Sequence, residues 1–434
     1  TDLDKYITKN NIKDVIPEFF GGIIKDKWEK SNMSIDKITL NILEVIAGNI
    51  SLGEFAKECE GKISIEEIIE IFTELKELKI INLDADVKKK VNDYESNRLS
   101  SPLRVFYDIT YQCNLRCKHC FTESGNAELN ELSKEEKLVL IEQLKELDVR
   151  RISIAGGEPF ACEDFYSFIK NCRENEIEVS VSTNGTFFDE KTVKEINEYE
   201  LKTITVSLDG ATEESNDFIR GKGTYKRIIK GLNNLKKYYK YNYCIKMTLM
   251  KTNIYDIESA IKLAIKTGCK SIKFNCVRED GRAHSNNEKI ILNRKEYIYV
   301  LREIERLKTK YKKEIIIKAP LNKYCDEEYY YISELGFGCF AGKESICIDA
   351  LGNVRACSHF PDEFIAGNIR EKTLKKIWCE SDILSKFRSL EGNKFCTECI
   401  DYDKCRGGCR YRAYISGDIN GIDPYCFNSD NIQN

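Results

Sequence analysis

The stretch Cys113-Asn114-Leu115-Arg116-Cys117-Lys118-His119-Cys120 decides the fold, and it follows directly after a predicted strand, Arg104–Thr110. Its cysteines are separated by three and two residues on one loop. Thiolates at this spacing can wrap one four-iron cluster and bind three of its irons, which leaves the fourth iron for an exogenous ligand. A partial zinc site, or loop cysteines without metal, is the alternative.

Predicted strands and helices alternate around this loop up to residue 318. The strands are Arg104–Thr110, Arg151–Ala155, Glu178–Ser182, Thr203–Leu208, Ile245–Met250 and Ser271–Asn275. The helices are Lys134–Leu147, Asp164–Asn175, Lys191–Tyr199, Lys226–Lys237, Tyr255–Lys266 and Arg294–Tyr311. This order implies a parallel α/β sheet, here an open, partial (β/α)6 TIM barrel. Ligands of such sheets lie at the carboxyl ends of the strands.

Small and polar residues occur at those strand ends. The second strand ends in Ala155-Gly156-Gly157-Glu158-Pro159, where glycines allow close backbone approach and a carboxylate can accept from an ammonium group. The third ends in Ser182-Thr183-Asn184-Gly185 and the fourth in Ser207-Leu208-Asp209-Gly210. These residue types suit a ribose and an amino-acid headgroup. Gly-Gly-Glu-Pro alone is typical of an ordinary turn, but beside the cysteine loop it indicates a ligand site.

Composition bounds the class of protein. The 434 residues allow about three domains. With 42% hydrophobic and 32% charged residues the chain is globular, and a net charge of −3 argues against a nucleic-acid binder. Acids near the N-terminus and the lack of a long apolar run predict a cytoplasmic protein that does not bind membranes. The count of 19 cysteines against 3 histidines favours iron–sulfur over zinc sites.

The first region, 1–97, has the pattern of a winged helix-turn-helix. Helices are predicted at Ile35–Ala47, Ser51–Glu58 and Ser64–Leu78, a strand at 80–83, and an earlier hairpin around Gly21–Ile24. Residues 1–95 hold 14 Lys or Arg and 20 Asp or Glu, a net charge of −6. Such an acidic module is poorly suited to DNA.

The third region, 319–434, is rich in cysteine and in turns. Cys339 and Cys357 flank a turn at Gly352, and a second group follows: Cys396, Cys399, Cys405, Cys409 and Cys426. This region looks too small to bury a large apolar core, so bound metal would explain how it folds. A pair of structural zinc sites is the alternative to iron–sulfur clusters.

Across 102–318 the sequence resembles the radical S-adenosylmethionine (SAM) enzymes, on the spacing of Cys113, Cys117 and Cys120 and on Gly156-Gly157-Glu158-Pro159. In that family a reduced cluster cleaves SAM to a 5′-deoxyadenosyl radical that abstracts a substrate hydrogen. The resemblance implies which residues contact each group of SAM. Gly156, Gly157 and Glu158 would meet the amino group, Ser182 and Asn184 the ribose or headgroup, Arg220 the carboxylate and His119 the adenine.

The C-terminal cysteines resemble the SPASM extension of radical SAM enzymes, which carries two auxiliary four-iron clusters. The resemblance assigns Cys339, Cys357 and Cys409 to the first auxiliary cluster, and Cys396, Cys399, Cys405 and Cys426 to the second. The fourth ligand of the first stays open. Cys347, on a predicted hairpin strand, is the nearest candidate, Cys325 and Cys379 are weaker ones, and an open iron is the remaining possibility.

The first region resembles the peptide-recognition element of enzymes that modify ribosomally made peptides, in which a leader peptide adds as a strand. The whole chain therefore resembles a radical SAM/SPASM peptide maturase. The implied activity is an intramolecular cross-link, a thioether as in SCIFF-type maturases or a carbon–carbon bond as in lysine–tryptophan cyclases. Implied partners are a precursor peptide and an electron donor such as flavodoxin or ferredoxin. Candidate bases near strand ends are Asp209, Glu279 and Asp280.

Two other functions are open. One is formylglycine formation of the anaerobic sulfatase-maturating type, although such enzymes lack the first region. The other is an iron–sulfur winged-helix regulator, against which the acidic first region and the complete Gly-Gly-Glu-Pro segment both count.

Overall fold

The computed structural model describes residues 98–286, 290–319, 338–426 and 428, and near the N-terminus 15–18, 21–24, 33–36 and 40–41. The chain forms two compact units, one built on residues 1–100 with 327–337 and one on 101–326 with 338–434. Each unit is described by itself.

The N-terminal unit contains a small antiparallel sheet in the order β1-β2-β3. Its strands are β1 (Val15–Glu18), β2 (Gly21–Ile24) and β3 (Met33–Asp36). The predicted hairpin around Gly21–Ile24 is confirmed. The helix expected from Ile35 was placed too early, because Ile35 pairs with Gly22 in the sheet. The other helices and the strand expected in this region lie outside the described residues, and so does the winged-helix pattern.

The second unit is built on one ten-stranded sheet, in the order β10-β9-β8-β7-β6-β5-β4-β11-β12-β13. Its parallel strands are β4 (Arg104–Asp108), β5 (Arg151–Ala155), β6 (Glu178–Thr183), β7 (Thr203–Ser207), β8 (Tyr243–Leu249), β9 (Ser271–Cys276) and β10 (Ile316–Lys318). All six predicted barrel strands are present within a few residues, and the partial barrel is confirmed. The short edge strand β10 was not predicted.

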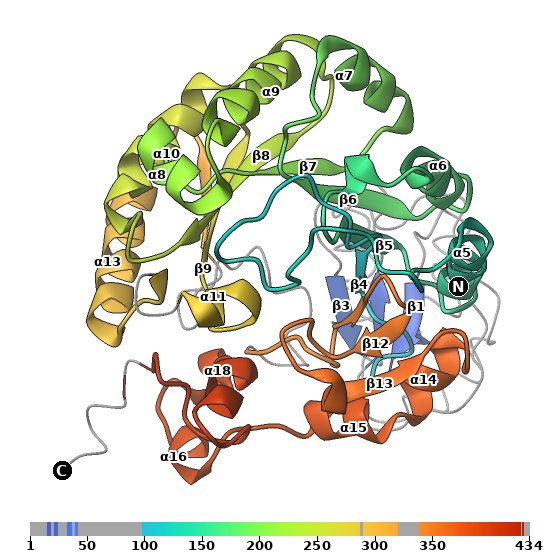
Figure 1. Cartoon of the computed structure of the whole chain (residues 1–434). Coiled ribbons are helices and arrows are strands. Elements are labelled where there is room, and N and C mark those ends of the chain that lie inside the picture. The colour runs from blue at the N-terminus through green and yellow to red at the C-terminus, as the bar shows by residue number, and fades with distance from the viewer. Residues whose placement is uncertain are drawn as a thin grey trace, which may run out of the picture. The chain divides into compact units, whose positions relative to one another are not determined.

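Helices cover the outer side of the curved sheet (Figure 1). They are α5 (Lys134–Glu146), α6 (Phe165–Glu174), α7 (Glu190–Ile196), α8 (Glu213–Arg220), α9 (Thr224–Tyr238), α10 (Ile257–Lys266) and α13 (Arg294–Tyr311). Alternate strand residues such as Ile152, Ile154, Ile245 and Met247 are fully or nearly fully buried, while the residues between them are partly exposed. The strands therefore present an apolar face to the helices and a more polar inner face.

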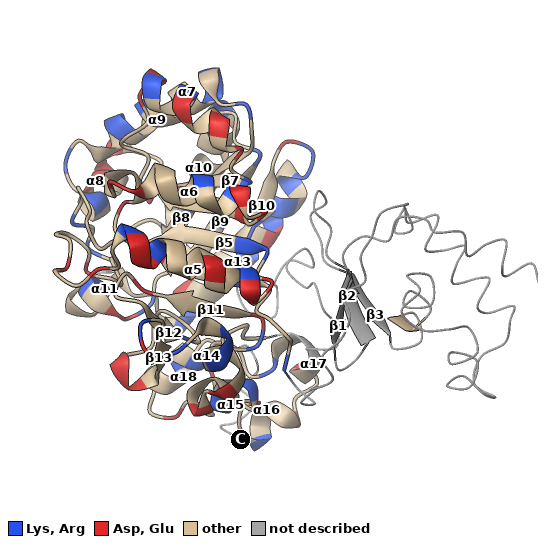
Figure 2. Ribbon diagram, turned by 90° about the vertical axis from the view of Figure 1, so that its right-hand side faces the viewer, with Lys and Arg blue, Asp and Glu red and all other residues tan. Residues whose placement is uncertain are grey.

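The outer helices carry Lys or Arg and Asp or Glu interspersed (Figure 2). This is the pattern of a solvated helix surface. Within the described part of the chain, no helix combines the length and the apolar character needed to span a membrane.

The C-terminal part continues the barrel sheet. β11 (Ser345–Ile348) pairs in parallel with β4, and β12 (Asn353–Arg355) and β13 (Ile365–Asn368) follow antiparallel. Short helices complete it: α14 (Leu374–Glu380), α15 (Asp382–Arg388), α16 (Lys394–Thr397), α17 (Tyr402–Cys405) and α18 (Arg410–Ile415). The expectation of a small apolar core was wrong here, because Ile346, Trp378 and Phe387 are almost fully buried. Joining an existing sheet gives this region apolar surface to pack on.

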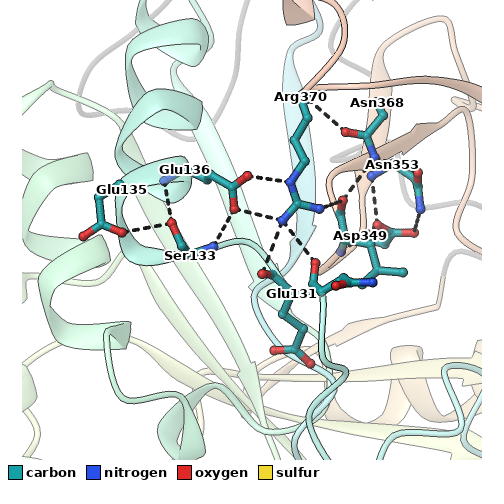
Figure 3. A network of polar contacts seen from close by, with 10 residues as sticks. Glu131, Ser133, Glu135, Glu136, Asp349, Asn353, Asn368 and Arg370 are labelled. Atoms are coloured by element: carbon teal, nitrogen blue, oxygen red, sulfur yellow. Dashed lines mark hydrogen bonds and ion pairs between the residues drawn. The ribbon is translucent and has the colours of Figure 1, made fainter.

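Arg370 joins the turn after β13 to the start of α5 (Figure 3). Its guanidinium donates to the Glu136 carboxylate at 2.5 and 2.8 Å and to the carbonyls of Asn130, Glu131 and Leu351. Glu136 also closes the capping box of α5 with Ser133. One arginine therefore connects the C-terminal hairpin to the first barrel helix.

We expect Arg370→Ala to loosen this connection. Because the Arg370 and Glu136 side chains are about one-third exposed (34% and 36%), the cost should be modest, about 1 kcal/mol in the free energy of local opening. Hydrogen exchange of β12 and β13 amides should be faster, with Arg302→Ala on the exposed face of α13 as the matched control. Equal protection in the variant and the wild type would contradict this role.

Candidate active site and iron–sulfur sites

The cysteine loop after β4 is closed by hydrogen bonds at its base. Cys113 N donates to Gly125 O, and Gly125 N donates to Tyr111 O, both at 2.8 Å. The Glu131 carboxylate accepts from the Thr110 hydroxyl at 2.7 Å and from Tyr111 N at 2.8 Å. These hydrogen bonds fix the geometry at the start of the loop. Its three cysteines are not joined in disulfide bonds.

The end of β5 packs directly on this loop. Gly157 N donates to Thr110 O at 2.7 Å and Glu158 N donates to Gln112 O at 2.8 Å. A Cβ atom at Gly156 would lie 2.4 Å from Thr110 O, and one at Gly157 would lie 2.2 Å from Gln112 O. Only glycine fits at either position, so this segment sets where the cysteine loop lies.

The Glu158 carboxylate turns toward the end of β6. It is fully buried and accepts from the Thr183 hydroxyl at 2.6 Å, from Asn184 N at 2.7 Å and from Phe160 N at 3.2 Å. Burial raises the pKa of Glu158 to about 7, even though these donors favour the charged form. Glu158 thus joins two strand ends, in addition to the ligand role that the resemblance assigns to it.

The end of β6 is also tied to the cysteine loop. Asn184 donates to Asn114 Oδ1 at 2.8 Å and accepts from the Thr186 hydroxyl at 2.7 Å. Ser182 lies two residues earlier, on the inner face of β6, and is partly exposed. Of the two residues expected to meet a ribose or headgroup, Asn184 is therefore engaged within the protein, and Ser182 faces the barrel interior.

Asp209, Arg220 and His119 form a buried cluster. Asp209 Oδ2 lies 2.7 Å from Arg220 Nη2 and 3.3 Å from His119 Nε2, and Oδ1 accepts from Thr248 N. Burial lowers the pKa of His119 to about 4, so Arg220 is the charged partner at neutral pH. Burial raises the pKa of Asp209, but Arg220, His119 and the Thr248 N–H together outweigh burial and hold this pKa below its ordinary value. Asp209 is therefore an ionised counter-ion.

Arg220 also approaches the cysteine loop. Its Nη1 lies 3.9 Å from Cys117 Sγ. The residue expected to bind the SAM carboxylate is thus placed beside a cluster thiol and is held there by Asp209.

Asp280 and Glu279 lie where the barrel meets the C-terminal part. Asp280 Oδ2 contacts His359 Nδ1, and His359 Nε2 lies 2.5 Å from Arg278 Nη1. The Glu279 carbonyl accepts from the Tyr411 hydroxyl at 3.1 Å. Sequence reasoning missed His359 and Arg278, although His359 stands only two residues after Cys357.

Asp108 was also missed. It is the last residue of β4, on the inner face of the barrel, and its Cα lies close to Gly156. Burial and then the Asp349 carboxylate raise the pKa of Asp108 to about 7. A carboxyl group with this pKa can take up or release a proton near neutral pH.

Four C-terminal cysteines, those that the resemblance assigns to the second auxiliary cluster, line one cavity. Cys396, Cys399, Cys405 and Cys426 surround it together with Tyr402, Asp423 and Asn428. Among the residues that the structure describes, no three Cys, His, Asp or Glu side chains are arranged to hold a single metal ion. Thiols spread around a cavity suit a polynuclear cluster better than one tetrahedral zinc ion.

The thiols assigned by the resemblance to the first auxiliary cluster, Cys339, Cys357 and Cys409, influence one another electrostatically. The thiol pKa of Cys357 is raised to about 12, by burial and also by Cys339 and Cys409 nearby. Cys409 is also buried, yet Arg412 and Arg278 bring its pKa below the ordinary value. Cys347 lies on β11 opposite Phe106 of β4, which confirms the predicted hairpin strand. Cys325 lies outside the described residues.

Buried arginines next to these thiols indicate whether the sites suit iron–sulfur clusters. Arg220 Nε, Arg278 Nε and two nitrogens of Arg410 are buried without a hydrogen-bond acceptor in the described part of the chain. Such donors are costly to bury alone. Anionic, thiolate-ligated clusters beside Cys117, Cys409 and Cys396 would supply the missing negative charge, so the residues fit iron–sulfur clusters.

Comparison with known proteins decides the family. Residues 107–264 match the Radical SAM superfamily, and residues 339–400 match the SPASM iron–sulfur cluster-binding domain. The chain is a radical SAM protein with a SPASM domain. These domains bind [4Fe–4S] clusters and SAM, which agrees with the thiols and the buried arginines.

Individual relatives extend this result. Mycofactocin maturase MftC of Mycolicibacterium smegmatis is 27% identical over 358 residues, covering 78% of this chain and 86% of MftC. The antilisterial bacteriocin subtilosin biosynthesis protein AlbA of Bacillus subtilis is 24% identical over 432 residues, covering 93% of this chain and 90% of AlbA. Streptococcus suis SuiB, solved with its precursor peptide SuiA, aligns with a TM-score of 0.71 at 18% identity over 94% of this chain and 97% of SuiB. SuiB has also been solved with S-adenosylmethionine.

We expect Gly157→Ala to displace the cysteine loop, because the new Cβ would overlap Gln112 O. Iron and sulfide per chain should fall by about four each, the content of the one cluster held by this loop. The C-terminal clusters should remain. A triple Cys113→Ala, Cys117→Ala, Cys120→Ala variant gives the reference value, and full iron content in Gly157→Ala would contradict the packing argument.

We expect Asp209→Asn to impair SAM cleavage itself. The change leaves the buried Arg220 without its counter-ion, which typically costs about 3–5 kcal/mol. The 5′-deoxyadenosine formed per chain should therefore drop together with any peptide product. Normal 5′-deoxyadenosine formation with loss of product alone would instead identify Asp209 as a proton acceptor.

Proposed function

We propose that this chain is a peptide maturase that installs an intramolecular cross-link in a ribosomally made precursor peptide. The observation that carries the proposal is the extent of the likeness. SuiB, which binds a precursor peptide, and AlbA, a bacteriocin biosynthesis protein, match 94% and 93% of this chain, N-terminal region included.

The N-terminal sheet supports binding of a leader peptide. β1 and β3 are the outer strands of the described three-stranded sheet. A peptide can add to such an edge through main-chain hydrogen bonds, while side-chain pockets give specificity. The net charge of −6 over residues 1–95 favours a leader with basic residues.

The barrel supports radical chemistry on the core of that peptide. When bound, the clusters and SAM supply the radical that removes a hydrogen atom from the substrate. The chain's own residues hold the cysteine loop against β5, place Arg220 beside Cys117 and leave a polar inner face for the substrate. Redox partners of the flavodoxin or ferredoxin type are the proposed electron donors.

Closing the cross-link releases one proton and one electron, so one group must accept the proton, and an auxiliary cluster, when bound, would accept the electron. Asp209 is committed to Arg220, which disfavours it as this group. Asp280 with its partner His359, Glu279, and Asp108 at the end of β4 are the candidates that we propose instead. The bond formed is a thioether or a carbon–carbon bond, depending on the residues that the precursor supplies.

The test is anaerobic incubation of the reconstituted full chain with SAM, a reductant and the short peptides encoded beside its gene. We expect 5′-deoxyadenosine together with a peptide that is lighter by two hydrogens, located by tandem mass spectrometry. Iron near ~12 per chain should accompany this activity, as three four-iron clusters require. 5′-Deoxyadenosine formation with every peptide unchanged would sink the proposal for these substrates, and formylglycine in place of a cross-link would favour the sulfatase-maturating alternative.

A further inference from the structure

Lysines lie side by side on the inner face of the barrel. Lys246 of β8 is in register with Lys273 of β9, which is in register with Lys318 of β10. The neighbours of Lys246 along its strand, Ile245 and Met247, are fully buried on the opposite, helix-covered face. Because strand residues alternate between faces, the lysine side chains of β8 and β9 belong to the barrel interior.

These lysines differ from those on the outside of the molecule. Outer lysines such as Lys194 and Lys262 pair with acids one helical turn away, and both signs of charge are interspersed over the outer helices (Figure 2). Among the described residues, no carboxylate lies within ion-pair distance of Lys246 or Lys273, although both are partly buried. Asp209, the carboxylate with the largest effect on the pKa of Lys246, is already paired with Arg220.

Lys246, which is in register with Lys273 on the inner face, lies close enough to three residues of the site to affect their pKa values. Burial is the main cause that lowers the pKa of His119 and of His359, and the Lys246 ammonium lowers each further. The same ammonium opposes the rise in the pKa of Asp108 that burial and Asp349 cause. These three residues belong to the cysteine loop, the SPASM part and the end of β4, so Lys246 is electrostatically coupled to all three.

Two adjacent ammonium groups without a protein counter-ion need an anion. Side chains in register on neighbouring strands lie about 5 Å apart, so both can donate to the oxygens of one carboxylate. We propose that Lys246 and Lys273 form a carboxylate-binding subsite inside the barrel. The carboxylate comes from an acidic residue or the C-terminus of the peptide, a source that rests on the proposed function, or from the methionine part of SAM.

The experiment compares Lys246→Met and Lys273→Met with Lys262→Met, an outer lysine that serves as the matched control. Methionine keeps the apolar stem, and iron content with thermal unfolding verifies folding of each variant. Equilibrium binding to the reconstituted full chain is measured for two probes without reductant. One probe is SAM, with decarboxylated SAM as its comparison, and the other is N-acetyl-Gly-Glu-Gly-amide, with its Gln counterpart.

The expected result is a loss of about tenfold or more in affinity for one carboxylate probe, with its counterpart that lacks the carboxylate unaffected and with rescue by Lys246→Arg. Loss for SAM assigns the subsite to the cofactor, and loss for the Glu peptide assigns it to the substrate. Unchanged affinity for both probes overturns the inference. Peptide modification by the wild type is scored separately, so failure of the proposed function and failure of the subsite give different outcomes.

Discussion

The contact between the end of β5 and the cysteine loop is the constraint on which the site depends. Gly157 and Glu158 donate their backbone N–H groups to the Thr110 and Gln112 carbonyls, and this close approach leaves no room for a Cβ at Gly156 or Gly157. The Glu158 carboxylate accepts a hydrogen bond from Asn184 N at the end of β6. The Asn184 side chain in turn donates to Asn114 on the cysteine loop. The three thiols are therefore positioned by a closed circuit of hydrogen bonds through two strand ends.

Buried positive charge is the second organising feature. Arg220, Arg278 and Arg410 each have at least one buried N–H with no acceptor among the described residues, and each lies near a cysteine assigned to a cluster. The positive charge of Arg220 faces two groups, the Asp209 carboxylate and the Cys117 thiol. Burying cations without carboxylate partners is unfavourable unless an anion completes the site. The interior is thus arranged around negative groups that the chain does not itself provide.

The continuous sheet explains how two cysteine regions far apart in sequence become one catalytic unit. β11 pairs with β4, the strand that leads into the cysteine loop, and this places Cys347 beside Phe106. Arg370 holds the hairpin to α5, while Asp280 and His359 join the other side of the barrel to the SPASM part. The barrel and the SPASM part are therefore joined on both sides by hydrogen-bonded contacts.

Local sequence determined six barrel strands, six barrel helices and the three-cysteine loop, and the resemblance to SPASM domains supplied the grouping of Cys396, Cys399, Cys405 and Cys426. Periodicity and cysteine spacing are local properties, and each is readable without knowledge of partners. Tertiary structure alone decided the pairing of β11 with β4 and the buried core of the C-terminal region, because strand pairing depends on residues more than two hundred positions apart. It also decided that Asp209 is a counter-ion, that His359 contacts Asp280 and that Lys246 lies in register with Lys273. A carboxylate or lysine looks the same in sequence whether it is solvated or buried, and only its neighbours in space set its charge and role.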